Sequence, residues 1–345
     1  MALSDTLKRL TAVFEGGALD ALRPPRYPGV AVEIAPDRVT GVRVGAERKG
    51  GRLRLEGVES RPLPEGAIEP SLASPNVLAP EPVTMALRDV LGRLAAGEHR
   101  ISMLVPDQVA RVSLLAFATL PRTRRELVEL TRFRMGKSLP FKAEDAVVDL
   151  LALNAGGVPG APPGAASVLA AFIHRAVVEQ YESLVTASGY WPGLVGLSSL
   201  ELYNLFRDRL EGRAGTDRDL LFLNATSHEL TVLIFRGQDL IFYRCKAHPP
   251  GSSTTDAIRA LGREVYTSLA FYQEKLLGRG MGRAFLRCAG VPREAVRDAV
   301  TAEVGCAVET LDLMDAVPLA AGLALDESTM DIAAPAVGAI LGRRR

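Results

Sequence analysis

The same order of strand patterns occurs twice in this chain, and this repeat limits the fold more than any other feature. Apolar and polar residues alternate over residues 29–44 and again over 52–60, with turn-forming residues between them. This pattern predicts three consecutive antiparallel strands. Three strand patterns recur at residues 220–224, 229–235 and 238–245, after a polar stretch at 211–218. The sequence therefore indicates an internal duplication.

Helix and strand patterns follow each set of three strands. In the first half, residues 83–96 have a helical period and residues 101–105 form a short apolar run. A further strand (194–197) and helix (198–210) close this half. The second half is predicted to contain helices at 256–277, 292–304 and 317–325, with strands at 284–288 and 307–311. This order is typical of a ribonuclease-H-like domain, so we predict an α/β chain with a duplicated ribonuclease-H-like fold.

Residues 109–189 interrupt the first half with a pattern of their own. They include a strand (111–117), a basic amphipathic helix (123–137), two hairpin strands (145–153 and 167–172) and a helix (176–188). The hairpin strands are joined by a Gly- and Pro-rich loop, which has too few apolar residues to form a core. We predict an inserted α+β subdomain at 109–189, between the two parts of the first half, residues 28–108 and 190–212. The second half is residues 216–345, and residues 1–27 form an N-terminal amphipathic helix and link.

Composition excludes several classes of protein. The chain has 345 residues, 41 Lys and Arg against 40 Asp and Glu, and 48% hydrophobic residues, which excludes a disordered chain and a histone-like polycation. Its three cysteines, Cys245, Cys288 and Cys306, are far apart and no histidine lies at ligand spacing, so no metal site and no disulfide framework are expected. No apolar run is long enough to span a membrane, and no signal peptide is predicted.

Five segments, in their order and spacing, resemble the PilM family of type IV pilus assembly proteins, which are actin-like and related to FtsA. They are residues 30–39 (VAVEIAPDRV), 138–149 (SLPFKAEDAVVD), 181–192 (YESLVTASGYWP), 264–272 (EVYTSLAFY) and 320–325 (AAGLAL). The resemblance covers about residues 28–326. It implies an actin-like fold in which the halves are subdomains 1A and 2A and the insertion is a 1C-type subdomain. Only residues 246–263 remain for subdomain 2B, the upper lip of the nucleotide cleft, so this lip is expected to be much reduced.

The resemblance also implies a nucleotide site between the halves, where two glycine-containing hairpins approach phosphate and an acidic residue positions magnesium. The family pattern Asp-Ile-Gly-Ser matches residues 33–36 here, and Asp-Ile-Gly-Ala matches 222–225. Phosphate must approach the backbone closely and accept from its N–H groups. Here Ala35 adds a methyl group at that point and Pro36 removes an N–H. Phe222 cannot organise a hydrated magnesium ion, although Asn224 can adopt the positive φ of glycine. The positions that remain of the site are Glu33, Ala35, Asp37, Asn224, Thr226, Ala289 and Gly290.

These changes predict a pseudo-ATPase with no catalytic residues, no metal ligands and no cofactor, where the family has ATP and magnesium. An active actin-like ATPase stays open as an alternative. A second alternative is a cytoplasmic platform component of a secretion system similar to GspL, which normally continues into a membrane helix; none is predicted here.

The resemblance implies a partner as well. In the family, a groove between subdomains 1A and 1C binds the N-terminal cytoplasmic peptide of PilN, a bitopic membrane protein. The candidate partner residues here are Arg125, Arg132, Phe133 and Phe141, from the basic helix and the corner after it. If the basic helix does not bind such a peptide, it is either an ordinary helix with a solvated face or a surface that binds an acidic partner or phospholipid headgroups. A near-neutral chain without aromatic interleaving in its basic segment gives no indication of nucleic-acid binding.

The implied function is a non-catalytic cytoplasmic scaffold at the inner face of the inner membrane. It would belong to a type IV pilus or a related envelope-spanning machine, bind a PilN-like protein and other platform or motor components, and form part of a ring. The C-terminal residues 335–345 are similar in kind to the membrane-binding helix of FtsA-like proteins. Because Gly338 and Gly342 weaken a helix, we expect a loose tail there.

Overall fold

The computed structural model describes residues 28–46, 53–153, 162, 164–215, 217–248 and 254–342. The predicted N-terminal helix and the terminal arginines Arg343–Arg345 lie outside these residues. Among the described helices, none has the length and the apolar run that a membrane span requires.

The first half is built on a five-stranded sheet with the order β3-β2-β1-β4-β8. The strands are β1 (Val30–Ile34), β2 (Arg38–Ala46), β3 (Leu53–Pro62), β4 (Arg100–Val105) and β8 (Trp191–Leu197). The first three pair antiparallel, whereas β4 is parallel to β1 and β8 is parallel to β4. Helix α2 (Pro80–Leu94) buries its apolar face, Val83, Leu87, Val90 and Leu91, on this sheet.

The second half repeats this arrangement in the order β11-β10-β9-β12-β13. Its strands are β9 (Asp219–Thr226), β10 (Glu229–Arg236), β11 (Asp239–Ala247), β12 (Met281–Ala289) and β13 (Val308–Thr310), with helices α6 (Thr254–Lys275) and α7 (Arg293–Val304). In both sheets the first strand lies between the second and the fourth. The duplicated ribonuclease-H-like fold is thus confirmed. Only residues 248–253 separate β11 from α6, so the expected lip subdomain is reduced to a short connection.

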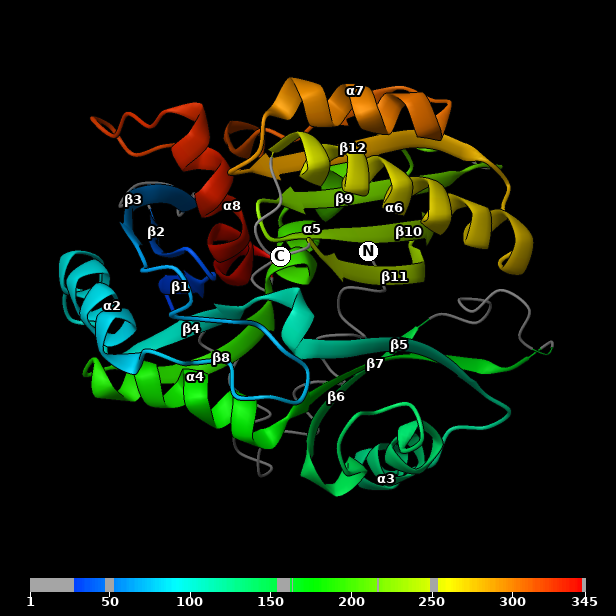
Figure 1. Ribbon diagram of the computed structural model, residues 1–345, viewed down its shortest axis with the longest axis horizontal. Helices are drawn as coiled ribbons and strands as arrows, with labels where there is room; N and C mark the ends of the chain where they lie inside the picture. Colours follow the sequence, from blue (N-terminus) through cyan, green and yellow to red (C-terminus); the bar gives the residue numbers. More distant parts are fainter. Residues whose placement is uncertain are drawn as a thin grey trace.

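Two helices at the centre of the molecule join the halves (Figure 1). Helix α5 (Ser198–Leu210) follows β8, and α8 (Glu327–Leu341) follows the short turn η4 (Leu313–Asp315) and a connecting segment. They pack so closely that a Cβ atom added to Gly338 would lie 2.0 Å from the backbone oxygen of Glu201. Small residues along α8 therefore permit the contact on which the core between the halves is built.

The C-terminal region differs from the prediction. Residues 317–325 are not helical; Gly322 has a positive φ of 84°, and the segment pairs with the edge of β3 through Leu55, whose N–H donates to Pro318 O at 2.9 Å. The helix begins only at Glu327, with Asp326 as its N-cap. Residues 335–341, expected to be a loose tail, are buried within this helix. The expectation was wrong because glycines that weaken an isolated helix are required where two helices approach closely.

The insertion forms a third sheet with the order β5-β7-β6, all antiparallel. Its strands are β5 (Ala110–Phe117), β6 (Ala146–Leu153) and β7 (Ala166–His174), with the turns η2 (Asp107–Val109) and η3 (Ala143–Asp145) and helix α3 (Arg124–Met135). Helix α4 (Arg175–Ala187) follows β7 but buries Val177, Tyr181 and Leu184 in the core of the first half. The described insertion therefore ends near His174 rather than at residue 189.

Candidate functional site

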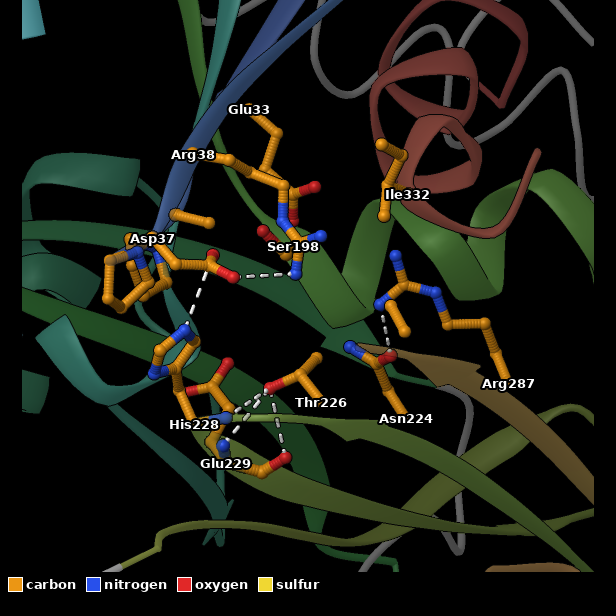
Figure 2. A pocket seen from close by; sticks show the side chains of 14 residues that line it. Glu33, Asp37, Arg38, Ser198, Asn224, Thr226, His228, Glu229, Arg287 and Ile332 are labelled. Carbon is orange, nitrogen blue, oxygen red and sulfur yellow. Dashed lines mark hydrogen bonds and ion pairs between the residues drawn. The ribbon is translucent and has the colours of Figure 1, made fainter. Parts of the chain in front are cut away.

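A small cavity lies between the halves, where the two hairpins of the duplicated fold face each other (Figure 2). Of the positions predicted from the nucleotide-site resemblance, six line this cavity: Glu33, Ala35, Asp37, Asn224, Thr226 and Ala289. The seventh, Gly290, follows Ala289 and lies beside Ser227 Oγ and an Arg38 guanidinium nitrogen. The open volume is about 30 Å³. Pockets for small-molecule ligands usually measure roughly 300–1,000 Å³, so this space holds a few water molecules at most.

Strand register shows which positions of the hairpins are equivalent. In the first hairpin Ile34 pairs with Val39, and in the second Ala225 pairs with Leu230, with four residues between the partners in each case. The equivalent of Glu33 is therefore Asn224, not Phe222 as the sequence comparison assumed. Phe222 is fully buried in the core between the halves. Where the first hairpin has a carboxylate, the second has an uncharged amide.

Asn224 also does not replace a glycine turn. It lies within β9 in register with Thr231, and Leu277 is the only described non-glycine residue with a positive φ. The turn falls at Ser227 and His228, within the connection predicted between the strands at 220–224 and 229–235. Thr226 occupies the position equivalent to Ala35, so both hairpins carry a Cβ atom where the family pattern has glycine.

The backbone N–H groups of the second hairpin are already bonded within the chain. The hydroxyl of Thr226 accepts from His228 N at 3.2 Å and from Glu229 N at 3.0 Å, while Ser227 N donates to Ala289 O at 3.2 Å. In the first hairpin Ala35 N donates to Arg38 O at 2.9 Å, and Pro36 has no N–H. Phosphate binding by a hairpin requires free N–H donors, and none of these five positions provides one.

Arg287 extends from β12 into the cleft and is only 3% exposed. Its Nη1 donates to Oδ1 of Asn224 at 2.8 Å, as Figure 2 shows. Burial lowers the pKa of this guanidinium, while the charges of Glu33 and Asp331 act in the opposite direction. Burial likewise raises the pKa of Glu33, opposed mainly by Arg287. A guanidinium of the chain itself thus provides positive charge next to the acidic position of the first hairpin and the amide of the second.

At the mouth of the cleft, the tips of the two hairpins contact each other. His228 Nε2 lies 3.3 Å from Asp37 Oδ1, and Arg38 pairs with the other oxygen of the same carboxylate at 3.0 Å. Burial would raise the pKa of Asp37, but the interactions with His228 and Arg38 outweigh it and hold the pKa below its ordinary value. This contact closes the mouth from both halves.

Behind the cavity, a polar network crosses between the halves. The carboxylate of Asp107, fully buried in η2, accepts from Ser199 N, Ser199 Oγ, Thr231 Oγ1 and Tyr243 OH. Asn224 Nδ2 donates to Ser199 Oγ at 2.8 Å, which links the network to Arg287. Sequence reasoning missed these residues. The sequence feature that could have indicated them is a single charged residue inside an otherwise apolar strand pattern, such as Arg287 within residues 284–289.

The predicted partner residues lie on and beside α3. Phe133 is 88% exposed and Arg125 is exposed, whereas Arg132 donates to Glu129 at 2.8 Å and to Ala146 O at 2.9 Å. Phe141 packs into the core of the insertion, with its ring edge-on to His174 at 4.8 Å. The four residues therefore do not form one exposed surface.

Helix α3 covers the sheet face opposite to the first half. Val168, Ala170 and Phe172 of β7 point toward α3, while Leu169, Ala171 and Ile173 pack against the core of the first half. The α3 residues consequently do not border the groove between the first half and the insertion.

Part of the face toward the first half is uncovered. In register with Ile173, Ala171 and Leu169 are Val147, Asp149 and Leu151 of β6, which we call the β6 face. Val147 is 38% exposed and Leu151 39%. Asp149 lies between these two apolar side chains and pairs with Arg124 of α3. Because the sheet order leaves β6 at an edge, the β6 face adjoins a strand edge without a partner strand among the described residues.

The described residues contain no group of three His, Cys, Asp or Glu side chains that could hold a metal ion. No protein-family model matches the sequence, and no curated protein matches it.

Comparison with solved structures finds chains similar to this one. One belongs to a PilM-PilN type IV pilus biogenesis complex and is 17% identical, with a TM-score of 0.77 over 93% of this chain and 100% of the compared chain. A second, the cytoplasmic domain of EpsL, an inner-membrane component of the type II secretion system of Vibrio cholerae, is 8% identical with a TM-score of 0.47, over 88% and 93%. The first match confirms, at the level of the fold, the resemblance to the PilM family.

Proposed function

We propose that this protein is a non-catalytic scaffold of a type IV pilus or related envelope-spanning machine, located in the cytoplasm at the inner membrane. The observation that carries the proposal is the occupied cleft. Arg287 extends between the two hairpins and bonds to Asn224. The N–H groups of Ala35, Ser227, His228 and Glu229 have acceptors within the chain. The remaining volume of about 30 Å³ is too small for a nucleoside triphosphate. On this account ATP and magnesium are not cofactors.

The alternative of an active ATPase has less support. Catalysis would need a carboxylate to position magnesium and free backbone donors for phosphate. Glu33 is the only carboxylate at the two equivalent hairpin positions, and it interacts with Arg287. A nucleotide would have to displace Arg287 from its hydrogen bonds before it could enter.

As partner we propose the cytoplasmic N-terminal peptide of a PilN-like bitopic membrane protein, bound at the β6 face. The similar solved structure contains PilM together with PilN. Val147 and Leu151 offer apolar contacts, and β6 has no partner strand on its outer side among the described residues, so an extended peptide could add there. Two β6 carbonyls, Ala146 O and Leu150 O, already accept from Arg132 and Arg124 of α3, so the peptide would have to share or displace these contacts. The α3 residues first considered lie on the opposite face of the sheet.

Two matched double variants test the proposal. A synthetic peptide with the N-terminal sequence of the PilN-like bitopic membrane protein proposed as the partner is titrated calorimetrically into the full chain. Val147→Glu with Leu151→Glu should weaken binding at least tenfold, whereas Arg125→Glu with Phe133→Glu on α3 should leave it unchanged. The reverse pattern would move the partner site to α3. Absence of binding by the unmodified chain would contradict the proposed function.

A further inference from the structure

Two buried carboxyl groups, Asp107 and Glu229, meet where the halves join. Asp107 follows β4 in the first half, and Glu229 begins β10 in the second. Asp107 is fully buried and Glu229 is 4% exposed. The backbone N–H of Asp107 donates to Glu229 Oε1 at 3.3 Å. Two carboxylates so placed cannot both be ionised without a large free-energy cost.

The two carboxyl groups differ in how well their charged forms are stabilised. Asp107 accepts from both the N–H and the hydroxyl of Ser199, from Thr231 at 3.2 Å and from Tyr243 at 2.9 Å. Glu229 accepts one backbone N–H and the weak thiol donor of Cys245 at 3.3 Å. Burial raises the pKa of Asp107 too, but its donors from Ser199, Tyr243 and Thr231 oppose this and favour its charged form. We therefore assign the proton to Glu229 and the charge to Asp107.

Arg38, His228 and Arg287 line the same cavity as Glu229, but the groups that act most strongly on its carboxyl are acidic or neutral. The groups are Asp107 of η2, Cys245 and Tyr243 of β11, and Tyr181 of α4, with the amide of Gln108 beside them. Burial first, and then the charge of Asp107, raise the pKa of Glu229 to about 8 from an ordinary 4.5. Burial raises the pKa of both Cys245 and Tyr243 well above their usual values, so neither loses its proton before Glu229.

We infer that Asp107 and Glu229 form a proton-dependent latch between the two halves, closed while Glu229 is protonated and opened by repulsion when it ionises. The latch is independent of any nucleotide or partner. It gives the fold an internal means of changing the contact between its halves, and it goes beyond the proposed scaffold function, which does not require the halves to move.

The direction of the pH dependence follows from linkage. Between about pH 4.5 and pH 8 the folded chain holds a proton that the unfolded chain releases, so stability falls as pH rises through this range. One such proton multiplies the unfolding equilibrium constant by about ten for each pH unit. Glu229→Gln, which keeps the size and neutrality of the protonated side chain, should remove this contribution.

The experiment compares the full chain with Glu229→Gln and with Glu294→Gln, an exposed control on α7. Urea unfolding is measured at pH 5.5, 6.5 and 7.5. For each pH unit, the unfolding equilibrium constant should rise by about tenfold more in the unmodified chain and in Glu294→Gln than in Glu229→Gln. Hydrogen exchange, corrected for intrinsic rates, should increase above pH 8 in residues 104–110 and 228–235, except in Glu229→Gln. Equal pH dependence in all three proteins would overturn the latch.

If Glu229→Gln does not fold, infrared spectroscopy of the unmodified chain tests whether a buried carboxyl is protonated. The carbonyl stretch of a protonated, buried carboxyl should be present at pH 6.5 and lost above pH 8. Absence of that band at pH 6.5 would overturn the inference. None of these readouts depends on the partner peptide, so the latch and the proposed scaffold function can fail separately.

Discussion

Arg287 donates two hydrogen bonds to the backbone carbonyl of Asp331, from Nε at 3.0 Å and from Nη2 at 2.6 Å. In an uninterrupted helix this carbonyl would accept from the N–H four residues later. That residue is Pro335, which has no N–H. The guanidinium therefore bonds to a carbonyl that proline leaves free, while its Nη1 reaches Asn224. One side chain of the second sheet thereby connects α8 to the cleft.

Replacing Arg287 with Met should lower the free energy of unfolding by about 2–4 kcal/mol, because the substitution leaves Asp331 O and Asn224 Oδ1 buried without their donor. Equilibrium unfolding of the full chain in urea measures this. Arg259→Met is the control, since the Arg259 side chain is 62% exposed and pairs with Asp256 on the surface of α6. Its effect should stay below about 0.5 kcal/mol. A similarly small effect at Arg287 would contradict a stabilising role of its hydrogen bonds to Asp331 and Asn224.

Pro335→Ala should reduce the cost of losing Arg287. The new N–H can donate to the Asp331 carbonyl, so Arg287→Met is expected to cost about 1 kcal/mol less in the Pro335→Ala background than in the unmodified chain. A double-mutant cycle in urea gives this coupling directly. Strict additivity of the two substitutions would show that the proline and the arginine act independently.

Gly338→Ala should destabilise the chain by about 3 kcal/mol or more, since its Cβ would lie 2.0 Å from Glu201 O and only a shift of α5 or α8 can relieve the overlap. Gly262→Ala provides the matched control. Gly262 lies inside α6 with nothing within 4 Å of an added Cβ, so this change should stabilise by about 0.5–1 kcal/mol. Thermal unfolding distinguishes the two, and equal effects would contradict the close packing of α8 on α5.

Tyr272→Phe should cost about 2 kcal/mol. The Tyr272 hydroxyl donates at 2.7 Å to Asp219, a fully buried carboxylate that also pairs with Arg236 at 2.8 Å, and hydrogen bonds to charged groups are stronger than neutral ones. Tyr266→Phe on the same helix is the control, because Tyr266 is 64% exposed. Urea unfolding should leave the control unchanged; a loss of the same size in both would exclude the buried bond as the cause.

Sequence patterns predicted the strands and most helices because alternating and helical periods record which face of each element is buried. They could not locate α8, where the apolar and small residues around Gly338 form no amphipathic stripe. They also could not fix the register of the second hairpin, because Phe222 and Asn224 both lie in one apolar strand and only pairing with β10 distinguishes them. Arg287, Asp107 and Ser199 meet only in the folded chain, so no local spacing indicates their network.

The most direct test of the account is one calorimetric titration of the bitopic protein's N-terminal peptide into the full chain, done with and without saturating magnesium and ATP. With the cleft occupied by Arg287, we predict the same dissociation constant in both conditions and no heat from ATP alone. Micromolar binding of ATP, or a peptide affinity that rises tenfold or more when nucleotide is present, would contradict the account.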